Sequence, residues 1–503
     1  MHFERKIEML YHSTRDNNKT LTAAGAIAGG LAKDGGLYVP EGFPKITAED
    51  IKKLVKLDYR GRAKYIMSLY LDDFSAEELT EYTSKAYADN YDTESAAPVN
   101  SVDDKTHFLE LWHGPTSAFK DMALQMLPYL MTASMKKTGE KRQVCILTAT
   151  SGDTGKAALE GFCDVEGTKI IVFYPENGVS DVQAMQMTSQ EGNNVCVYAV
   201  KGNFDDAQAG VKAIFSDEAL REKLDGEGWF LSSANSINWG RLLPQIVYYV
   251  SAYCDLVAAG KIAAGDKINF CVPTGNFGNI LAGFYAMNMG LPVNRLICAS
   301  NSNDVLTDFI RTGVYDRNRP FFTTISPSMD ILVSSNLERL LYHVSGENDE
   351  FVRDCMTKLS TEGKYKVSEE VLAKIQNTFS CGCCGEEDTK AAVAGVYNKY
   401  NYLIDTHTGV AYSVLEKYRA ETGDNTVSVV VSTASPYKFC GAVLDAIGGE
   451  CAGSGLDMID ALEEKTGVKA PAPLAGLRGK TVRFTGCVEK TKMTDCVVDF
   501  IKE

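Results

Sequence analysis

A lysine stands near the start of a predicted helix in the segment Trp112–Leu127. The Pro-Thr-Ser triplet at positions 115–117 is typical of a helix start and puts Lys120 in or near the first turn. The residues three, four and seven positions further on are apolar. Burial among them and the positive end of the helix dipole both favour a neutral amine. A neutral amine is what imine formation with an aldehyde cofactor requires. The alternative is a lysine whose stem is buried while its head reaches water.

A turn of small residues follows the predicted strand Val144–Leu147. The hydroxyls and backbone N–H groups of this turn, Thr148–Gly155, converge on one point, which suits a carboxylate or a phosphate. It is not a Walker A loop, because Thr150 replaces the first glycine and Ala157 replaces the hydroxyl residue after Gly-Lys. An ordinary strand-to-helix turn is the alternative.

A second turn of this kind, Pro273–Gly283, follows the predicted strand Ile268–Val272. Its glycines let backbone N–H groups approach a phosphate, and the helix that follows supplies a favourable field. The spacing is not that of a dinucleotide-binding glycine motif, and a plain turn is again the alternative. Two such turns after two separate strands favour a phosphorylated ligand.

Two further segments offer polar groups at the ends of elements. Residues 431–439 read Val-Ser-Thr-Ala-Ser-Pro-Tyr-Lys-Phe, and they bring hydroxyls and the Lys438 cation to a strand end. Residues 235–245 open a predicted helix with several amides, and Asn238 and Arg241 share a face because they lie three positions apart. Helix capping and solvent contact are the alternative for both segments.

These segments need a scaffold that brings strand ends together. Short β-rich runs, each followed by a turn and a helical pattern, predict strands buried on both faces of a parallel sheet. The runs are Val144–Thr148, Ile170–Phe173, Val195–Val200, Ile268–Val272, Leu296–Ala299 and Val427–Val431. Repeated units of this kind predict an open α/β architecture, in which ligands lie at the carboxyl ends of strands. The first hundred residues have helical spacing instead, notably over Ile51–Ser84.

Composition excludes several classes of function. The 503 residues carry 51 Lys and Arg against 66 Asp and Glu, a net charge of −15, which argues against a general nucleic-acid or anionic-membrane binder. No apolar run approaches a spanning helix, and Met1–Arg15 lacks the apolar core of a secretory signal. We therefore expect a cytoplasmic protein with reduced thiols. No metal is expected, because no ligand pair at zinc spacing follows Cys381, Cys383 and Cys384.

Eight short motifs lie in a fixed order along most of the chain. They are Tyr11–Arg15, Asp34–Pro40, His113–Asp121, Thr150–Gly155, Asn235–Asn238, Pro273–Gly278, Ile404–Val410 and Ser432–Phe439. Each motif is moderately specific alone, and the ordered set is highly specific. Together they resemble the threonine synthase family, in its longer branch found in fungi and many bacteria.

The resemblance implies a pyridoxal 5′-phosphate enzyme. Its fold would consist of two open α/β domains of the tryptophan-synthase-β type with a mostly helical N-terminal segment. The implied division is 1–100 for that segment, 101–236 for the half with the lysine and the substrate carboxylate, 237–450 for the half with the cofactor phosphate, and 451–503 for a tail packed on the core.

The resemblance also implies residue roles. Lys120 matches the lysine that holds the cofactor as an imine, and Thr433 matches the residue that meets the pyridine nitrogen. The loop that holds the cofactor phosphate matches Gly275, Asn276, Phe277, Gly278 and Asn279. The segment that receives the substrate carboxylate matches Thr150, Ser151, Gly152, Asp153 and Thr154. By residue type and position, further substrate contacts are Asn235, Asn238 and the candidate phosphate-binding cations Arg241, Lys156 and Lys438.

The family reaction is a carbon–oxygen lyase reaction that converts O-phospho-L-homoserine and water to L-threonine and phosphate, the last step of threonine biosynthesis. With the cofactor ring as electron sink, Lys120 would carry protons between the substrate carbons. Phosphate would then leave, and water would add at Cβ. The implied partner is this small molecule alone, with the protein a monomer or a homodimer.

Two motifs depart from the family pattern. Ser435 and Tyr437 stand where the family usually has His and Ala, which alters the rim near the pyridine edge. Residues 405–410 read Asp-Thr-His-Thr-Gly-Val where the usual motif is Asp-Pro-His-Thr-Ala-Val. Two alternatives stay open: a phospho-lyase of the same fold that releases 2-oxobutyrate, and a non-catalytic relative that only binds the cofactor. The carbon product separates the first alternative, and inertness toward phosphorylated amino acids marks the second.

Overall fold

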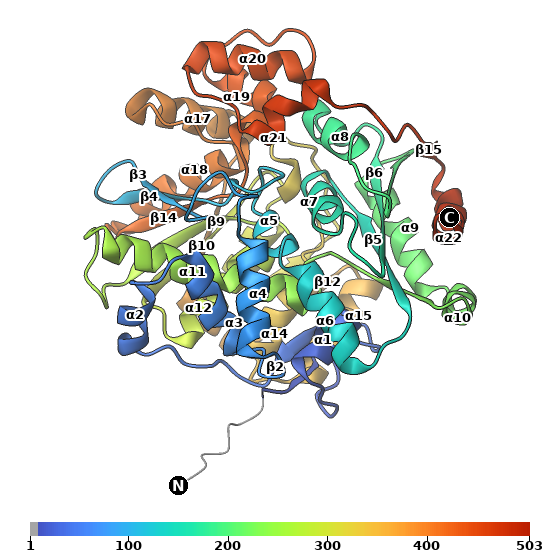
Figure 1. Cartoon of the computed structure of the whole chain (residues 1–503). Coiled ribbons are helices and arrows are strands. Elements are labelled where there is room, and N and C mark those ends of the chain that lie inside the picture. Colours follow the sequence, from blue (N-terminus) through green and yellow to red (C-terminus); the bar gives the residue numbers. More distant parts are fainter. Residues whose placement is uncertain (1–8) are drawn as a thin grey trace.

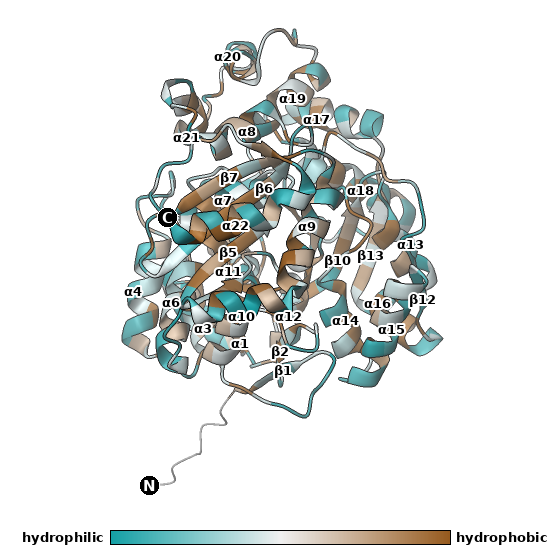
Figure 2. Ribbon diagram, turned by 90° about the vertical axis from the view of Figure 1, so that its right-hand side faces the viewer, coloured by the Kyte–Doolittle hydropathy of each residue, from teal (hydrophilic) through white to brown (hydrophobic). Residues whose placement is uncertain are grey.

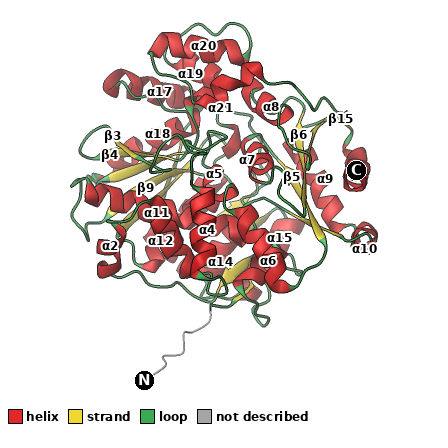
Figure 3. Cartoon of the chain, in the orientation of Figure 1, coloured by secondary structure: helices red, strands yellow, loops and turns green. Residues whose placement is uncertain are grey.

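The computed structural model describes residues 9–503. Two open sheets stand side by side with helices packed between and around them (Figures 1 and 3). The predicted α/β architecture is therefore confirmed, and all six predicted strands are present. In the described part of the chain, no helix combines the length and apolarity that crossing a membrane requires.

The first sheet has six strands. Their order is β13 (Phe379–Cys383), β10 (Val293–Ser300), β9 (Ile268–Pro273), β14 (Ser428–Ser432), β4 (Thr106–Glu110) and β3 (Val99–Ser101). All neighbours are parallel except β3, which runs antiparallel to β4. Because β14 pairs with both β4 and β9, it brings the early residues 106–110 beside a strand that is more than three hundred residues later.

The second sheet has five parallel strands. Their order is β15 (Cys487–Val488), β7 (Val195–Val200), β6 (Thr168–Pro175), β5 (Gln143–Ala149) and β8 (Trp229–Ser232). Both of its faces are buried: Ile146 packs into one hydrophobic core and the next residue, Leu147, into another. The continuous apolar runs of these strands follow from this burial, and Figure 2 shows β5 and β7 in hydrophobic colours.

Helices cover both sheets. Those around the five-stranded sheet are α7 (Asp153–Gly161), α8 (Asp181–Thr188), α9 (Phe204–Ser216), α10 (Glu218–Gly226) and α22 (Met493–Lys502). Those that join or cover the six-stranded sheet are α5 (Asp121–Leu124), α6 (Leu127–Thr138), α11 (Trp239–Ala258), α12 (Gly278–Met289), α13 (Val305–Thr312), α14 (Leu337–Val344), α15 (Asp349–Thr361), α16 (Glu369–Thr378), α17 (Glu386–Tyr400) and α18 (Thr406–Thr422). A short ribbon of β11 (Val314–Asp316) and β12 (Lys364–Lys366) lies outside them.

Two ends of the chain add smaller layers. The N-terminal segment contains β1 (Tyr11–Ser13), α1 (Ala23–Gly29), β2 (Tyr38–Pro40), α2 (Ala48–Leu54), α3 (Tyr59–Ser68) and α4 (Ala76–Ala86). The helical spacing predicted over Ile51–Ser84 is confirmed, and it falls in the three helices α2, α3 and α4. Near the other end, α19 (Cys440–Ala446), α20 (Gly455–Thr466) and α21 (Ala472–Ala475) gather beside α17 (Figure 1).

The domain boundaries stay a prediction. Strands β3 and β4 both lie before residue 237, yet they belong to the sheet whose other four strands fall within 237–450. The tail 451–503 supplies β15 to the edge of the five-stranded sheet. The chain therefore crosses between its two halves more often than a linear division implies.

Candidate active site

Lys120 lies just beyond the carboxyl end of β4, where the chain turns over the sheet edge. The Phe119 N–H donates to the Thr433 carbonyl at 2.8 Å, which pins Lys120 beside the end of β14. The predicted helix start at 115–117 is too early, because α5 begins at Asp121, but Lys120 directly precedes its first turn and so lies near it as predicted. The Asp121 carboxylate accepts the Thr116 N–H at 2.8 Å and its hydroxyl at 2.7 Å, and this folds the triplet into a turn.

The environment of Lys120 favours its neutral amine. Burial, and after it the neighbouring positive charge of Arg241, lower the Lys120 pKa to about 7. The Lys120 ammonium position lies 4.2 Å from the centre of the Phe119 ring. The Lys120 side chain is partly exposed, and it lines a cavity. The neutral amine predicted from the sequence is therefore supported by geometry and by charge.

The cavity brings together residues from five segments of the chain. Its lining residues are Phe119, Lys120, Pro273, Thr274, Gly275, Phe277, Asn279, Ser328, Met329, His407 and Thr433. Five of these were singled out by the sequence: Lys120, Gly275, Phe277, Asn279 and Thr433. Asn276 and Gly278 lie in the same turn but do not line the cavity.

The glycine turn between β9 and α12 is built for close approach. A Cβ at Gly275 would lie 2.6 Å from the Ser328 carbonyl oxygen, so a larger residue does not fit there. Phe277 has a left-handed φ of 63° and precedes the first residue of α12. The turn thus points the N-terminus of a buried helix at the cavity, a favourable position for an anion.

Asn279 offers the cavity a free donor. Its Oδ1 accepts the hydroxyls of Tyr248 and Tyr249, both at 2.7 Å. Its Nδ2 is buried and has no partner among the described residues. Buried donors are rarely left unpaired, so this amide fits a bound group that carries oxygen atoms.

Some polar groups of the turn between β5 and α7 form hydrogen bonds within the turn itself. The Thr150 hydroxyl accepts the N–H groups of Gly152 at 3.0 Å and Gly155 at 2.9 Å. Asp153 forms an ion pair with Lys438, with 2.9 Å between Oδ1 and Nζ. Ser151 and Thr154 remain partly exposed, but no residue of this turn is among those that line the cavity around Lys120.

The three candidate cations differ sharply. None of the three is among the residues that line the cavity. Lys156 pairs with Glu160 at 2.8 Å and with Gln190. Lys438 is fully buried and pairs with Asp153. Both lysines already have partners, which argues against either as the ligand of a substrate phosphate.

Arg241 is the cation that keeps capacity for an anion. It is buried, its Nη1 donates to the Ala234 carbonyl at 2.6 Å, and its Nε has no partner in the described chain. Burial lowers its pKa to about 10. A buried guanidinium with an unpaired donor is a strong site for a carboxylate or phosphate.

Other predicted contacts serve the fold. Asn238 caps α11 through the Gly240 N–H at 2.8 Å, and its Nδ2 donates to the Ile27 carbonyl at 3.0 Å. Asn235 stays partly exposed at the start of the same turn. Tyr437 turns away from the cavity, and its hydroxyl donates to the Val468 carbonyl at 2.6 Å. The Ser435 hydroxyl caps the Tyr437 N–H.

The other six lining residues were not assigned a role from sequence, and they are Phe119, Pro273, Thr274, Ser328, Met329 and His407. His407 stands in a motif that the sequence singled out, so its place after the buried Asp405 was a usable signal. Residues 327–329 form a short 3₁₀ helix, η1, that follows no strand. No pattern of strand and turn could have marked it.

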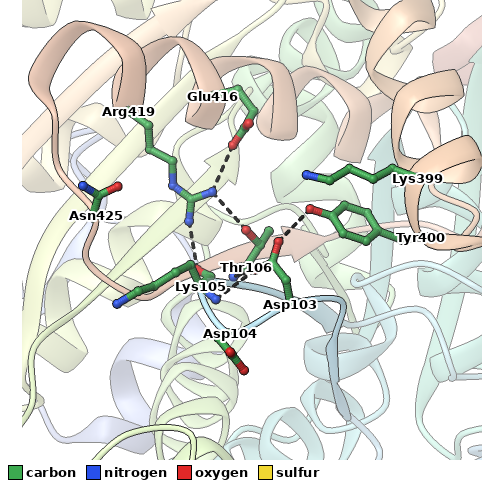
Figure 4. Close-up of a pocket in the computed structure, with 9 residues that line it drawn as sticks. All are labelled: Asp103, Asp104, Lys105, Thr106, Lys399, Tyr400, Glu416, Arg419 and Asn425. Carbon is green, nitrogen blue, oxygen red and sulfur yellow. Dashed lines mark hydrogen bonds and ion pairs between the residues drawn. The ribbon is translucent and has the colours of Figure 1, made fainter.

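A second hollow lies at the opposite end of the six-stranded sheet. It has a volume of about 390 Å³ and is lined by residues that include Thr106 at the start of β4 (Figure 4). Arg419 spans it, with donors to the Thr106 hydroxyl, the Glu416 carboxylate and the Lys105 carbonyl. Ligands of open α/β sheets lie at the carboxyl ends of strands, so this hollow is not the active site.

Comparisons with known proteins identify the family of this chain. Family models match over residues 10–87 (threonine synthase N terminus), 102–433 (pyridoxal-phosphate dependent enzyme) and 408–498 (threonine synthase, C-terminal). Threonine synthase of Pseudomonas aeruginosa is 39% identical over 439 residues, which cover 86% of this chain and 90% of that protein. The chain belongs to the threonine synthase family.

A solved structure and a human protein are also similar to this chain. The structure of pyridoxal-phosphate-bound threonine synthase from Brucella melitensis matches with a TM-score of 0.87 and 36% identity, covering 99% of this chain and 100% of that one. Human threonine synthase-like 1 is 41% identical over 433 residues, which are 84% of this chain. The match spans 57% of that human protein, less than two thirds of its length.

The cofactor is pyridoxal phosphate, and the threonine synthase fold here suits it. With the cofactor bound, the free Asn279 Nδ2 and the glycine turn would be the donors available to its oxygen atoms, and Lys120 would be the amine available to its aldehyde. Among the described residues 9–503, no cluster of metal-binding side chains occurs. Cys381 and Cys383 lie on β13, away from the cavity lining.

The Lys120 pKa predicts how cofactor capture depends on pH. We expect the rate at which apoprotein captures pyridoxal phosphate to rise with pH, reach half its maximum near pH 7 and level off above about pH 8, because half of the amine is neutral at its pKa and nearly all of it one unit higher. Stopped-flow absorbance of the bound cofactor measures this rate. Nα-acetyl-lysine, with an amine pKa of about 10.4, is the control and should keep accelerating to pH 9. A protein that also keeps accelerating to pH 9 would contradict the lowered pKa.

Proposed function

We propose that the chain is a threonine synthase that converts O-phospho-L-homoserine and water to L-threonine and phosphate. Membership of the family supports this proposal. The observation that carries it is the Lys120 amine in a cavity beside a glycine turn. Burial and the positive charge of Arg241 lower the pKa of this amine to about 7.

The side chains have separate tasks in this reaction. Pyridoxal phosphate, when bound, supplies an electron sink that acidifies the carbon beside the substrate nitrogen. Lys120 removes and returns protons at the substrate carbons, and a pKa of about 7 suits both directions near neutral pH. The turn over Ser151–Thr154 binds the substrate carboxylate, while Arg241 binds its phosphate. The glycine turn and η1 line the cavity in which these steps would take place.

The phosphate role of Arg241 has a direct test. Arg241→Met is expected to raise KM for O-phospho-L-homoserine by about 10- to 100-fold, because a hydrogen bond to a charged group is lost. Initial-rate kinetics measure this. Lys156→Met is the matched control and should leave KM unchanged, because Lys156 pairs with Glu160 instead. An unchanged KM in Arg241→Met would exclude Arg241 as the phosphate ligand.

The product decides between synthase and phospho-lyase. Purified protein mixed with O-phospho-L-homoserine should release phosphate and threonine in equal amounts. Phosphate with 2-oxobutyrate would assign the chain to the lyase class and turn attention to Ser435, which replaces the usual histidine near the cofactor. Cofactor absorbance with no turnover of any phosphorylated amino acid would favour a non-catalytic relative.

A further inference from the structure

A short stretch of chain closes one side of the cofactor cavity. We call residues 324–334 the strap. Its η1 residues Ser328 and Met329 line the cavity. The Ser328 carbonyl lies against Gly275, where a Cβ would approach it to 2.6 Å, and the Ser334 hydroxyl donates to the Gly275 carbonyl at 2.9 Å. The position of the strap therefore sets how closely the cavity wall meets the glycine turn.

The first turn of α18 holds the strap at two points. The Thr406 hydroxyl donates to the Ile325 carbonyl at 2.7 Å. Three residues further along the strap, the Ser328 N–H donates to His407 Nε2 at 3.2 Å. Thr406 stands where the family pattern usually has proline, which has no hydroxyl, so the first contact is a property of this chain.

Asp405 fixes the orientation and tautomer of His407. Its Oδ2 lies 2.8 Å from His407 Nδ1 and accepts the His407 N–H at 2.9 Å. Its Oδ1 accepts the Thr408 N–H at 3.1 Å and also the Thr408 hydroxyl. With the ring proton on Nδ1, Nε2 is an acceptor and suits the N–H of Ser328. Asp405 and His407 are both buried, so water does not compete for these bonds.

A further hydrogen bond joins the strap to the half of the molecule that contains the five-stranded sheet. The Ser328 hydroxyl donates to Asp153 Oδ2 at 3.3 Å, at the first residue of α7. The strap thus touches the glycine turn, the first turn of α18 and the substrate-carboxylate turn. A shift of the strap would therefore change its contacts with all three of these segments at once.

We propose that His407, oriented by Asp405, and Thr406 are positioning residues that fix the strap as a wall of the cofactor cavity. Neither residue reacts. They hold Ser328 and Ile325, and so keep the cavity at the size that retains pyridoxal phosphate. The proposal depends on the cofactor site and is independent of which product the enzyme releases.

Two variants of His407 separate its acceptor from its donor. His407→Asn keeps an amide near Nδ1 to face Asp405 but removes the acceptor for Ser328. His407→Gln places an amide near the position of Nε2. We expect the dissociation constant for pyridoxal phosphate, titrated into apoprotein, to rise about 5- to 10-fold in His407→Asn, the effect of one lost hydrogen bond. His407→Gln should stay within about 2-fold of the parent chain.

Amide hydrogen exchange provides a readout that does not depend on turnover. Peptides covering the strap should exchange about 5- to 10-fold faster in His407→Asn and in Thr406→Val, but not in Thr406→Ser. Thr422→Val is the matched control at the far end of α18, where the hydroxyl donates to the Tyr418 carbonyl. It should leave strap exchange and cofactor affinity unchanged.

The outcomes are unambiguous. The proposal is supported if His407→Asn and Thr406→Val show faster strap exchange and weaker cofactor binding, while His407→Gln and Thr406→Ser keep the exchange rate and affinity of the parent chain. Unchanged strap exchange in both His407→Asn and Thr406→Val overturns it. A third result would also overturn the proposal. If His407→Asn and His407→Gln lose cofactor affinity equally and melt at a lower temperature, while Thr406→Val behaves like the parent chain in affinity and strap exchange, then His407 only stabilises α18. Failure of the His407 variants to fold leaves the Thr406 pair to decide.

Discussion

Replacing Lys120 by alanine is expected to lower the rate of phosphate release from O-phospho-L-homoserine by at least about 10²- to 10⁴-fold. That range is the usual contribution of one positioned acid–base group, and Lys120 also provides the amine that meets the cofactor. The pKa of about 7 makes the group available as both base and acid near neutral pH. A phosphate-release assay and the visible absorption of the bound cofactor measure the two roles separately.

Two lysine controls sharpen this test. Lys120→Arg keeps a cation in the cavity but cannot supply a neutral amine near pH 7, so it should be as inactive as the alanine variant. Lys156→Ala removes a lysine on α7 that pairs with Glu160, and it should remain active. Turnover by Lys120→Ala at the parental rate would remove Lys120 from the reaction and contradict the proposed function.

Removing the Lys438 ammonium is expected to cause the largest loss of stability. Lys438 and Asp153 are buried and 2.9 Å apart, one at the end of the six-stranded sheet and the other at the end of the five-stranded sheet. Lys438→Met leaves the Asp153 carboxylate buried without its charge partner, which typically costs about 3–5 kcal/mol. Denaturant unfolding of the apoprotein measures this change in the free energy of unfolding.

The Asp153–Lys438 ion pair should also affect how the free energy of unfolding depends on pH at acid pH. Burial alone would raise the Asp153 pKa, but the Lys438 ammonium and its hydrogen bond bring it to about 2, below the usual 3.8. The ionised carboxylate therefore stabilises the folded chain above about pH 4, and this contribution is lost as the pH falls toward 2. In Lys438→Met the difference in stability from the parent should shrink over that window.

A double variant checks the origin of the effect. Asp153→Asn with Lys438→Met removes both charges and should recover part of the stability that Lys438→Met alone loses. If the double variant is as unstable as the sum of the two single variants, the ion pair is not what holds these turns together.

Much of the fold could be predicted because its central strands are simple. The runs at Val195–Val200 and Ile268–Val272 are continuous and apolar, as strands buried on both faces must be. Two strands that the sequence missed have mixed composition. Strand β4 reads Thr-His-Phe-Leu-Glu and β13 reads Phe-Ser-Cys-Gly-Cys, and neither has a clear period or an apolar run. Their place is set by pairing with β14 and β10, which local sequence does not encode.

The site divides in a similar way. Residues that follow a strand, such as Gly275 and Thr433, could be located because parallel strands end at one edge. The lysines could not be ranked, because residue type does not reveal that Lys438 faces Asp153 or that Lys156 faces Glu160. Ser328 could not be found at all, since only the fold of residues 313–336 brings η1 over the cavity.

The pairing of β4 with β14 has a consequence for how the molecule is made. Trp112 Nε1 donates to the Ser432 hydroxyl at 3.1 Å across a sequence separation of 320 residues. Because a chain leaves the ribosome from its N-terminus, β4 waits with an open edge while most of the polypeptide is still being translated, and such edges invite wrong partners. The cofactor cavity needs Thr433, and so it is among the last parts of the molecule to assemble. A nascent chain that stalls before residue 428 carries Lys120 but has no pocket to hold it.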